Sequence, residues 1–264
     1  MTSPTQPTVA ERDPVLVFEL SNHELTFLLR LLGAQGMLGY VPEETLDAQT
    51  NAILTDVLRA RGFLVPNEDG ELVIRTGLDA ILAAGALFGG AISLQVVDDA
   101  GVTTQHWFYL NREVVVYHTA PQARVQRFVT VPDALALASL IANIMGIDPN
   151  RLEKPTLAPI NIALGDWQHI VEMNRDNRQA ELAEVLRGAG MSEQVVTALT
   201  QTGRRSVLTL LLPREGEQVE SHSLLLFTAP NGYWLLVPEG EVMTMQPANA
   251  RDVLDKLVEF LNHR

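Results

Sequence analysis

The feature that most constrains the fold is a run of four short β-forming segments that occurs twice along the chain. The first run extends from Ile92 to Val131, where segments rich in Val, Ile, Phe, Tyr and Thr are separated by short polar breaks. This pattern predicts a meander of antiparallel strands joined by tight turns. A comparable run extends from Val207 to Pro247. We therefore expect one structural unit that is present in two copies.

The first meander is preceded by a predicted strand, Val15–Leu20, and by helices with recognisable ends. Ser21 and Glu24 have the spacing of a capping box, and Gly33 is a residue type that commonly ends a helix. Between them, leucines recur with helical periodicity at Leu25, Leu28, Leu29 and Leu32. A second helix is predicted to begin at Pro42, because proline suits the first turn of a helix.

A small hairpin and a short helix complete the first half before its meander. The hairpin is predicted for Phe63–Val65 and Leu72–Ile74, and the helix for Leu78–Leu87. After each meander a proline, Pro132 or Pro247, is expected to begin a helix. The helix after Pro132 is apolar on nearly all sides, so we expect it near the centre of the molecule or between its halves.

These elements together predict an α+β protein with two related halves. Each half would contain helices, a four-stranded antiparallel meander and a closing helix, and an internal pseudo-twofold axis would relate the halves. We predict a disordered tail at residues 1–14, the first half at 15–147, a proline-containing linker at 148–160 and the second half at 161–264. The two halves are expected to pack as one unit.

The overall composition narrows the possible partners and the compartment. The chain has 19 Lys and Arg against 32 Asp and Glu, a formal net charge of −13 that disfavours nucleic acid as a partner. The sequence contains no cysteine, which excludes disulfides, thiolate nucleophiles and cysteine-bound metals. No apolar run is long enough to span a membrane, and the first residues lack the pattern of a signal peptide. We expect a cytoplasmic protein that binds neither nucleic acid nor a membrane.

No group of residues forms a recognisable catalytic motif, so we predict no catalytic residues, no metal site, no cofactor and no enzymatic activity. His106 and His118 could meet across a hairpin and bind a metal, but ordinary strand histidines are the favoured interpretation. Asp98 and Asp99 could bind calcium or act as an acid–base pair, but turn residues that bond their own backbone are the favoured interpretation. The helix ending at Ala60 and the hairpin after it resemble part of a winged helix, a DNA-binding element. Their charged side chains are mostly acidic, however, which disfavours contact with DNA phosphates.

The absence of catalytic motifs and the acidic surface favour protein binding. The residues that we predict to contact a partner are those of the first meander's opening turn: Asp98, Asp99, Gly101 and Val102. This turn is polar and has no evident capping or packing role, and exposed turns often carry binding residues. Gly101 can supply a positive φ there. The oligomeric state is left open.

Three segments of the chain resemble the EspG family, the cytoplasmic chaperones of ESX (type VII) secretion. They are VFELSNHELTFLLRLLG from Val17, DVLRARGFLVPNEDGELVI from Asp56, and YWLLVPEGEVMTMQPANARDVLDKLVEFL from Tyr233. The order and spacing of the segments cover most of residues 15–261. The resemblance implies a fold of two related halves and a non-enzymatic chaperone for helical substrates of the PE/PPE type. It assigns no binding residue. A small-ligand sensor or regulatory domain remains the alternative.

Overall fold

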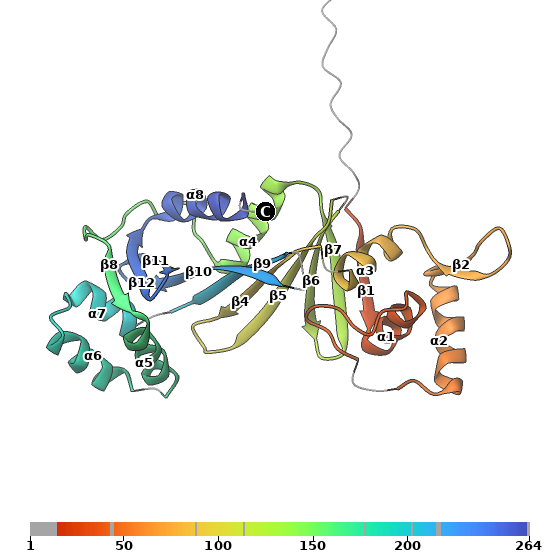
Figure 1. Ribbon diagram of the computed structural model, residues 1–264, viewed down its shortest axis with the longest axis horizontal. Helices are drawn as coiled ribbons and strands as arrows, with labels where there is room; N and C mark the ends of the chain where they lie inside the picture. The colour runs from red at the N-terminus through yellow and green to blue at the C-terminus, as the bar shows by residue number, and fades with distance from the viewer. Residues whose placement is uncertain are drawn as a thin grey trace, which may run out of the picture.

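The computed structural model describes residues 15–42, 45–87, 89–112, 114–176, 178–201, 203–214 and 218–262. The predicted tail, residues 1–14, lies outside the described residues. The core element is a single antiparallel sheet of ten strands, in the order β1-β7-β6-β5-β4-β9-β10-β11-β12-β8 (Figure 1). The two meanders are therefore continuous with each other, because β4 and β9 pair directly at the centre of the sheet.

The first five strands of the sheet come from the first half of the chain. They are β1 (Val17–Ser21), β4 (Ala91–Val97), β5 (Thr103–Leu110), β6 (Val115–Gln122) and β7 (Val125–Val131). The other five come from the second half, namely β8 (Ile160–Ala163), β9 (Arg205–Pro213), β10 (Val219–Ala229), β11 (Gly232–Glu239) and β12 (Val242–Ala248). Each predicted meander thus gains a fifth strand, β1 or β8, at the outer edge of the sheet.

One face of the sheet is covered by two helices that lie side by side, α4 (Ala134–Met145) and α8 (Ala250–Leu261). They pack on the alternate residues Ile92, Leu94 and Val96 of β4 and on neighbouring strands of both halves. The helix after Pro132 is α4, and its position against β4, β7 and α8 confirms the expectation that it lies near the centre.

The opposite face is covered only towards its two ends. At one end lie α1 (Asn22–Leu31), α2 (Ala48–Ala60) and α3 (Leu78–Ala86), whose apolar residues pack with those of β1, β6 and β7. At the other end lie α5 (Leu164–Arg175), α6 (Gln179–Gly188) and α7 (Glu193–Thr200), packed with residues of β8, β10, β11 and β12. The predicted hairpin is present as β2 (Leu64–Pro66) and β3 (Leu72–Ile74), beside α2 (Figure 1).

The beginning of α1 confirms the predicted capping box. The Glu24 backbone N–H donates to Ser21 Oγ at 3.2 Å, and the Ser21 N–H donates to the Glu24 carboxylate at 2.7 Å. Gly33 follows the helix with a φ of +73°. Both ends of this helix are set by local chemistry, which is why the sequence predicts them well.

Three other helix starts were predicted too early. The second helix begins at Ala48 rather than at Pro42, because the Asp47 side chain caps it by accepting from the Thr50 N–H. The closing helices begin at Ala134 and Ala250, capped by the side chains of Asp133 and Asn249. Pro247 lies in β12 instead. In each case an Asp or Asn that can bond the free N–H groups sets the start more strongly than a nearby proline does.

The predicted linker has no helix or strand before β8, but several of its residues contact the second half. The Arg151 guanidinium donates to the carbonyl of Ala229 at 2.7 Å, and Lys154 pairs with Asp252 at 2.7 Å. The division of the chain into two domains stays a prediction. Over the described residues, every helix is too short or too polar to cross a membrane.

Candidate functional site

The part of the sheet that no helix covers well is the middle of the face between the two outer groups of helices. We call it the open sheet face and define it by six residues of four adjacent strands: Ser93, Gln95, Gln105, Val207, Thr209 and Ser223. All six side chains are half-buried or exposed. The intervening residues of β4, Ile92, Leu94 and Val96, are buried on the other side beneath α4 and α8. The central strands therefore present one covered and one accessible side.

The strand register places these side chains in rows that cross the sheet. Ser93 lies between Trp107 on one neighbouring strand and Thr209 on the other, and Thr209 is next to Ser223. Side chains of neighbouring strands bond each other, with Gln105 Nε2 donating to Ser93 Oγ at 2.8 Å and Thr209 Oγ1 lying 3.2 Å from Ser223 Oγ. These two hydrogen bonds run across the sheet, so part of the polar character of the open sheet face is satisfied within the face itself.

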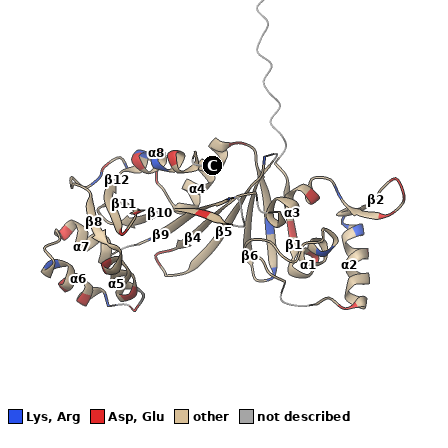
Figure 2. Cartoon of the chain, in the orientation of Figure 1, with Lys and Arg blue, Asp and Glu red and all other residues tan. Residues whose placement is uncertain are grey.

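The open sheet face is neutral in a chain with a large negative charge. Strands β4 and β5 contain no Asp, Glu, Lys or Arg. Acidic and basic residues are instead frequent on helices, for example on α6 at one end of the same face and on α8 on the covered face (Figure 2). The patch shares with the cores of protein–protein interfaces the depletion of charged residues, and Trp107 beside it is of a residue type enriched there.

The predicted partner-binding turn adjoins one end of the open sheet face, because β4 and β5 lead directly into it. Asp98 Oδ1 accepts from the N–H groups of Ala100 at 2.9 Å and Val102 at 2.8 Å, and Gly101 has a φ of +79°. Asp98 is therefore a turn-forming residue, as the favoured interpretation holds. Asp99 and Val102 are exposed, and Asp99 also lies against Gly203 of the loop before β9. The binding role of the turn stays a prediction.

The two histidines considered as metal ligands are on opposite faces of the sheet. The residue opposite His106 is Thr119, whereas the residue opposite His118 is Trp107. Neighbouring residues of a strand point to opposite sides, so the two imidazoles cannot share a metal ion. No cluster of three or more His, Asp or Glu with metal-binding geometry occurs within the described part of the chain.

His118 is instead the centre of a buried polar network. Its Nδ1 lies 2.5 Å from the Tyr109 hydroxyl, and its Nε2 lies 2.8 Å from Gln126 Oε1. The ring also stacks on Phe128 with a centroid separation of 4.5 Å. Because His118 is only 2% exposed, burial lowers its pKa to about 4, although the bond to Gln126 acts in the opposite direction. The folded protein therefore holds this imidazole neutral at pH 7.

This burial predicts that the stability of the protein falls with mild acidification. Above pH 6.5 the imidazole is neutral in both states. Below that value the unfolded chain binds a proton that the folded chain does not bind until about pH 4. The free energy of unfolding should fall by up to about 3 kcal/mol across this window. Urea titrations between pH 7 and pH 5 would measure it. The dependence of the free energy of unfolding on pH should be weaker in His118→Gln. It should persist in a control, His169→Gln, which removes an exposed imidazole. An equal pH dependence in all three proteins would contradict the role given to His118.

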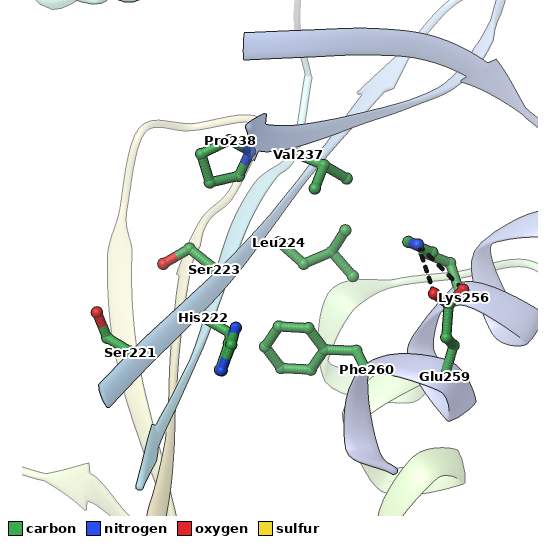
Figure 3. A pocket seen from close by; sticks show the side chains of 9 residues that line it. All are labelled: Ser221, His222, Ser223, Leu224, Val237, Pro238, Lys256, Glu259 and Phe260. Carbon is green, nitrogen blue, oxygen red and sulfur yellow. Dashed lines mark hydrogen bonds and ion pairs between the residues drawn. The ribbon is translucent and has the colours of Figure 1, made fainter. Parts of the chain in front are cut away.

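A small cavity of about 180 Å³ lies on the covered side of the sheet, between β10, β11 and α8 (Figure 3). Its lining includes His222, Phe260 and the ion pair of Lys256 with Glu259, in which Lys256 Nζ lies 3.0 Å from Glu259 Oε1. Pockets for small ligands usually have volumes of about 300 to 1,000 Å³. We therefore assign no ligand to this cavity.

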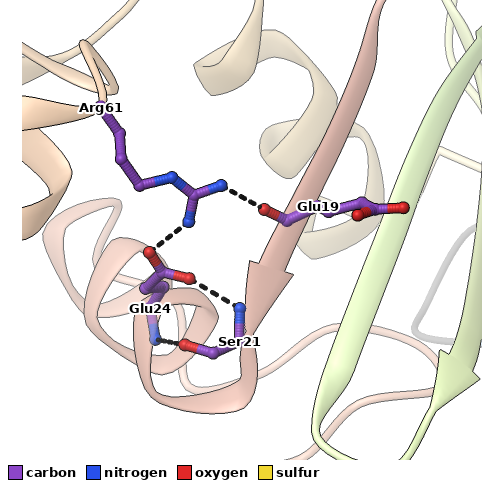
Figure 4. A network of polar contacts seen from close by, with 4 residues as sticks. All are labelled: Glu19, Ser21, Glu24 and Arg61. Atoms are coloured by element: carbon purple, nitrogen blue, oxygen red, sulfur yellow. Dashed lines mark hydrogen bonds and ion pairs between the residues drawn. The ribbon is translucent and has the colours of Figure 1, made fainter.

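One buried carboxylate, that of Glu24, connects α1 with β1 and the end of α2. Glu24 accepts from the guanidinium of Arg61, which also donates to the Glu19 carbonyl at 2.8 Å (Figure 4). Burial raises the pKa of Glu24, but the bonds from Ser21 and Arg61 outweigh that effect and the net pKa is lowered. Residues from β1, α1 and the end of α2 are thereby joined at one point.

Comparison with known proteins identifies a solved structure with a similar fold. No protein-family model matches the sequence, and no curated protein matches it. Among solved structures, the chain is similar to the type VII secretion system chaperone EspG5 of Mycobacterium tuberculosis, solved in complex with a PE25-PPE41 dimer. The similarity has a TM-score of 0.67 at 14% sequence identity and covers 92% of this chain and 95% of that chain. The chain thus shares the α+β fold of the EspG5 chaperone, as the sequence resemblance implied.

Proposed function

We propose that this protein is a non-enzymatic chaperone or adaptor that binds a helical secretion substrate on its open sheet face. The observation that carries the proposal is the neutral, accessible strip at the centre of the sheet, flanked on both sides by helices. Support for the type of substrate comes from EspG5, a chaperone of the same fold that was solved with a PE25-PPE41 dimer. A PE/PPE-like protein or another helical hairpin in the cytoplasm is the proposed substrate.

The chemistry of the open sheet face suits a protein helix better than the other classes of partner. Its hydroxyl and amide groups can bond a partner's polar side chains, and Val207 and Trp107 offer apolar contact. An amphipathic helix binds through its apolar face, and Val207 and Trp107 are the apolar groups that this face could contact. A nucleic acid would need basic residues, yet Arg205 is the only Lys or Arg in β4, β5, β9 and β10.

Replacement of Thr209 by Arg should abolish substrate binding without unfolding the protein. Thr209 is half-buried at the centre of the open sheet face, where a long charged side chain would prevent a helix from approaching and would be left without a partner. We expect affinity to fall by about 100-fold, which corresponds to about 3 kcal/mol. Co-expression of the tagged protein with PE/PPE-like proteins of the same genome, followed by calorimetry on the purified pair, would measure the effect.

A matched control is Thr119→Arg, since Thr119 is a half-buried strand threonine on the opposite face of the sheet. It should bind as the wild-type protein does. If both variants bind equally well, the open sheet face is not the binding surface; if the wild-type protein captures no helical partner, the chaperone proposal itself is wrong.

We also propose that the turn Asp98, Asp99, Gly101 and Val102 extends the binding surface. Its support is its position at the end of β4 and β5 and the exposure of Asp99 and Val102. In the same assay, Asp98→Lys combined with Asp99→Lys should weaken association while the protein stays folded. The single variant Asp99→Lys preserves the Asp98 bonds that form the turn. Unchanged binding by both folded variants would confine the surface to the strands.

The internal pseudo-twofold relation of the halves is a further part of this proposal. It is supported by the strand order, which runs outward from the β4–β9 pair through three meander strands to an edge strand on each side. Such an arrangement would place the open sheet face on the axis, flanked by equivalent helices. It also accommodates the proposed limits of the halves at residues 15–147 and 161–264.

A further inference from the structure

A second cavity, of about 520 Å³, lies beside α1 and apart from the open sheet face. Three segments form its walls: the first turns of α1, the loop at residues 39–41, and the β6–β7 turn with the start of β7. The lining residues are Asn22, His23, Thr26, Gly39, Tyr40, Val41, Ala123, Arg124 and Gln126. Its volume falls within the range of about 300 to 1,000 Å³ that is usual for small-molecule sites.

The floor of this cavity consists of ordered polar groups. Tyr40 donates its hydroxyl proton to the Asn22 carbonyl at 2.7 Å, and its oxygen lies 2.7 Å from Thr26 Oγ1. Gln126, which is 8% exposed, donates from Nε2 to Asn22 Oδ1 at 2.9 Å and meets His118 Nε2 through its own Oε1. The floor is therefore anchored in the buried network below it.

This bonding pattern leaves hydrogen-bond donors on two residues that line the cavity. Because Asn22 Oδ1 accepts from Gln126, the donor group of the Asn22 side chain is its NH₂ group. Gln126 Nε2 carries two protons, of which the bond to Asn22 uses one. Amide donors held in fixed positions are suited to the oxygens of an anion.

The charged residues of the lining also favour an anionic ligand. The nine lining residues include Arg124 and His23 but no Asp or Glu, although the chain has 32 acidic residues against 19 basic ones. A third cavity, beside α8, is lined by Asp252, Asp255 and Glu259 as well as by two lysines. The cavity beside α1 is thus lined by an arginine and by no acidic residue in a strongly negative protein.

The backbone of Arg124 adds an independent observation. Its φ is +69°, and no other residue except glycine has a positive φ within the described ranges. Glycine would adopt this conformation without strain, whereas arginine does so at a cost. The Arg124 carbonyl also accepts from the Asn22 N–H at 3.0 Å, which joins the turn to α1 across the cavity. A strained arginine at the rim of a polar cavity is a feature expected of a ligand contact.

We infer that this cavity binds a small anionic molecule, with Arg124 pairing with its carboxylate or phosphate group and Asn22 and Gln126 donating to its oxygens. The inference is independent of the chaperone function, because the cavity lies over β7 and α1 rather than over the central strands.

The test uses the full-length protein at low ionic strength, with citrate and inorganic phosphate as probes in separate calorimetric titrations. We expect saturable binding of at least one probe at millimolar concentration or below, and the stronger of the two identifies the carboxylate or the phosphate class. Arg124→Gly should weaken that binding by about tenfold or more, the loss expected for one charge-assisted hydrogen bond. It should also leave the protein at least as heat-stable, because it relieves the strained φ.

The matched control is Arg127→Ala, which removes a nearby arginine from the other face of the sheet, where it lies 3.7 Å from Glu19. It should bind the probe as the wild-type protein does. An equal loss in both variants would show a diffuse effect of net charge and overturn the site. So would unchanged binding by Arg124→Gly, or no saturable binding of either probe to the wild-type protein up to about 10 mM. None of these results depends on whether a helical substrate binds.

Discussion

Replacement of Gly39 by Ala should destabilise the protein by about 3 kcal/mol, a large effect for the addition of one methyl group. Two causes add together. Gly39 has a φ of +77°, which residues other than glycine adopt only with strain. A Cβ atom at this position would also lie 2.1 Å from Nε1 of Trp107, so the indole ring would have to move. Urea denaturation of the purified variant would measure the loss.

Gly33→Ala separates these two causes. Gly33 has nearly the same backbone conformation, with a φ of +73°, but a Cβ atom there would meet no atom within 4 Å. It should therefore show the conformational cost alone, about 1 kcal/mol. A comparable loss in the two variants would mean that the loop at Gly39 does not press on Trp107. The distinction matters because Trp107 borders the open sheet face, and a displaced indole should also disturb substrate binding.

Replacement of Arg61 by Ala should destabilise the protein by about 2 kcal/mol, because it leaves the buried Glu24 carboxylate without its cationic partner. The guanidinium also donates to the Glu19 carbonyl (Figure 4). It lies over the ring of Phe63 as well, 4.4 Å from the ring centroid. We expect less than the full effect of a dry ion pair, since the Arg61 side chain is 38% exposed. Thermal unfolding would measure the loss.

The pH dependence of the same variant tests the role of Glu24. Because the pKa of Glu24 is lowered in the folded protein, its ionised form contributes stability above its ordinary value of 4.5. That contribution should disappear as the pH falls below 4.5, and Arg61→Ala should then resemble the wild-type protein more closely. Arg59→Ala, which removes an exposed arginine from the same helix, should change stability by at most about 0.5 kcal/mol. An Arg59→Ala loss as large as that of Arg61→Ala would show that general charge, not the Glu24 contact, is responsible.

The sequence predicted elements whose signals are local. The capping box of Ser21 with Glu24 is complete within four residues. The strands on both sides of the Asp98 turn are each indicated by a short continuous run of β-forming residues. Helix starts that depend on a choice between local signals were predicted less well. Asp47, Asp133 and Asn249 begin their helices although a proline a few residues earlier offered a competing start.

Most residues of the candidate sites could not be predicted from the sequence. Thr209 and Ser223 meet in one hairpin, but Ser93 is more than a hundred residues away from both, and only the pairing of β4 with β9 places all three in one row. Arg124 and Asn22 are likewise about 100 residues apart and meet through an antiparallel edge pairing that the sequence pattern does not reveal. One local signal was available for Arg124: two-residue hairpin turns favour a positive φ, and this turn contains no glycine to adopt it.

By itself the sequence determined most strands, most helices, the α+β class and the absence of cysteine chemistry, because each depends on short-range periodicity or on composition. It did not indicate the edge strand β8. The tertiary structure decided that the two meanders form one sheet, that α4 and α8 cover only one side of it, and that a neutral strip stays accessible between the outer helices. It also decided that His106 and His118 face opposite ways. The physical reason is that strand register and packing are set by contacts between residues far apart in the chain, and a shift of one residue in register exchanges the two faces of a strand.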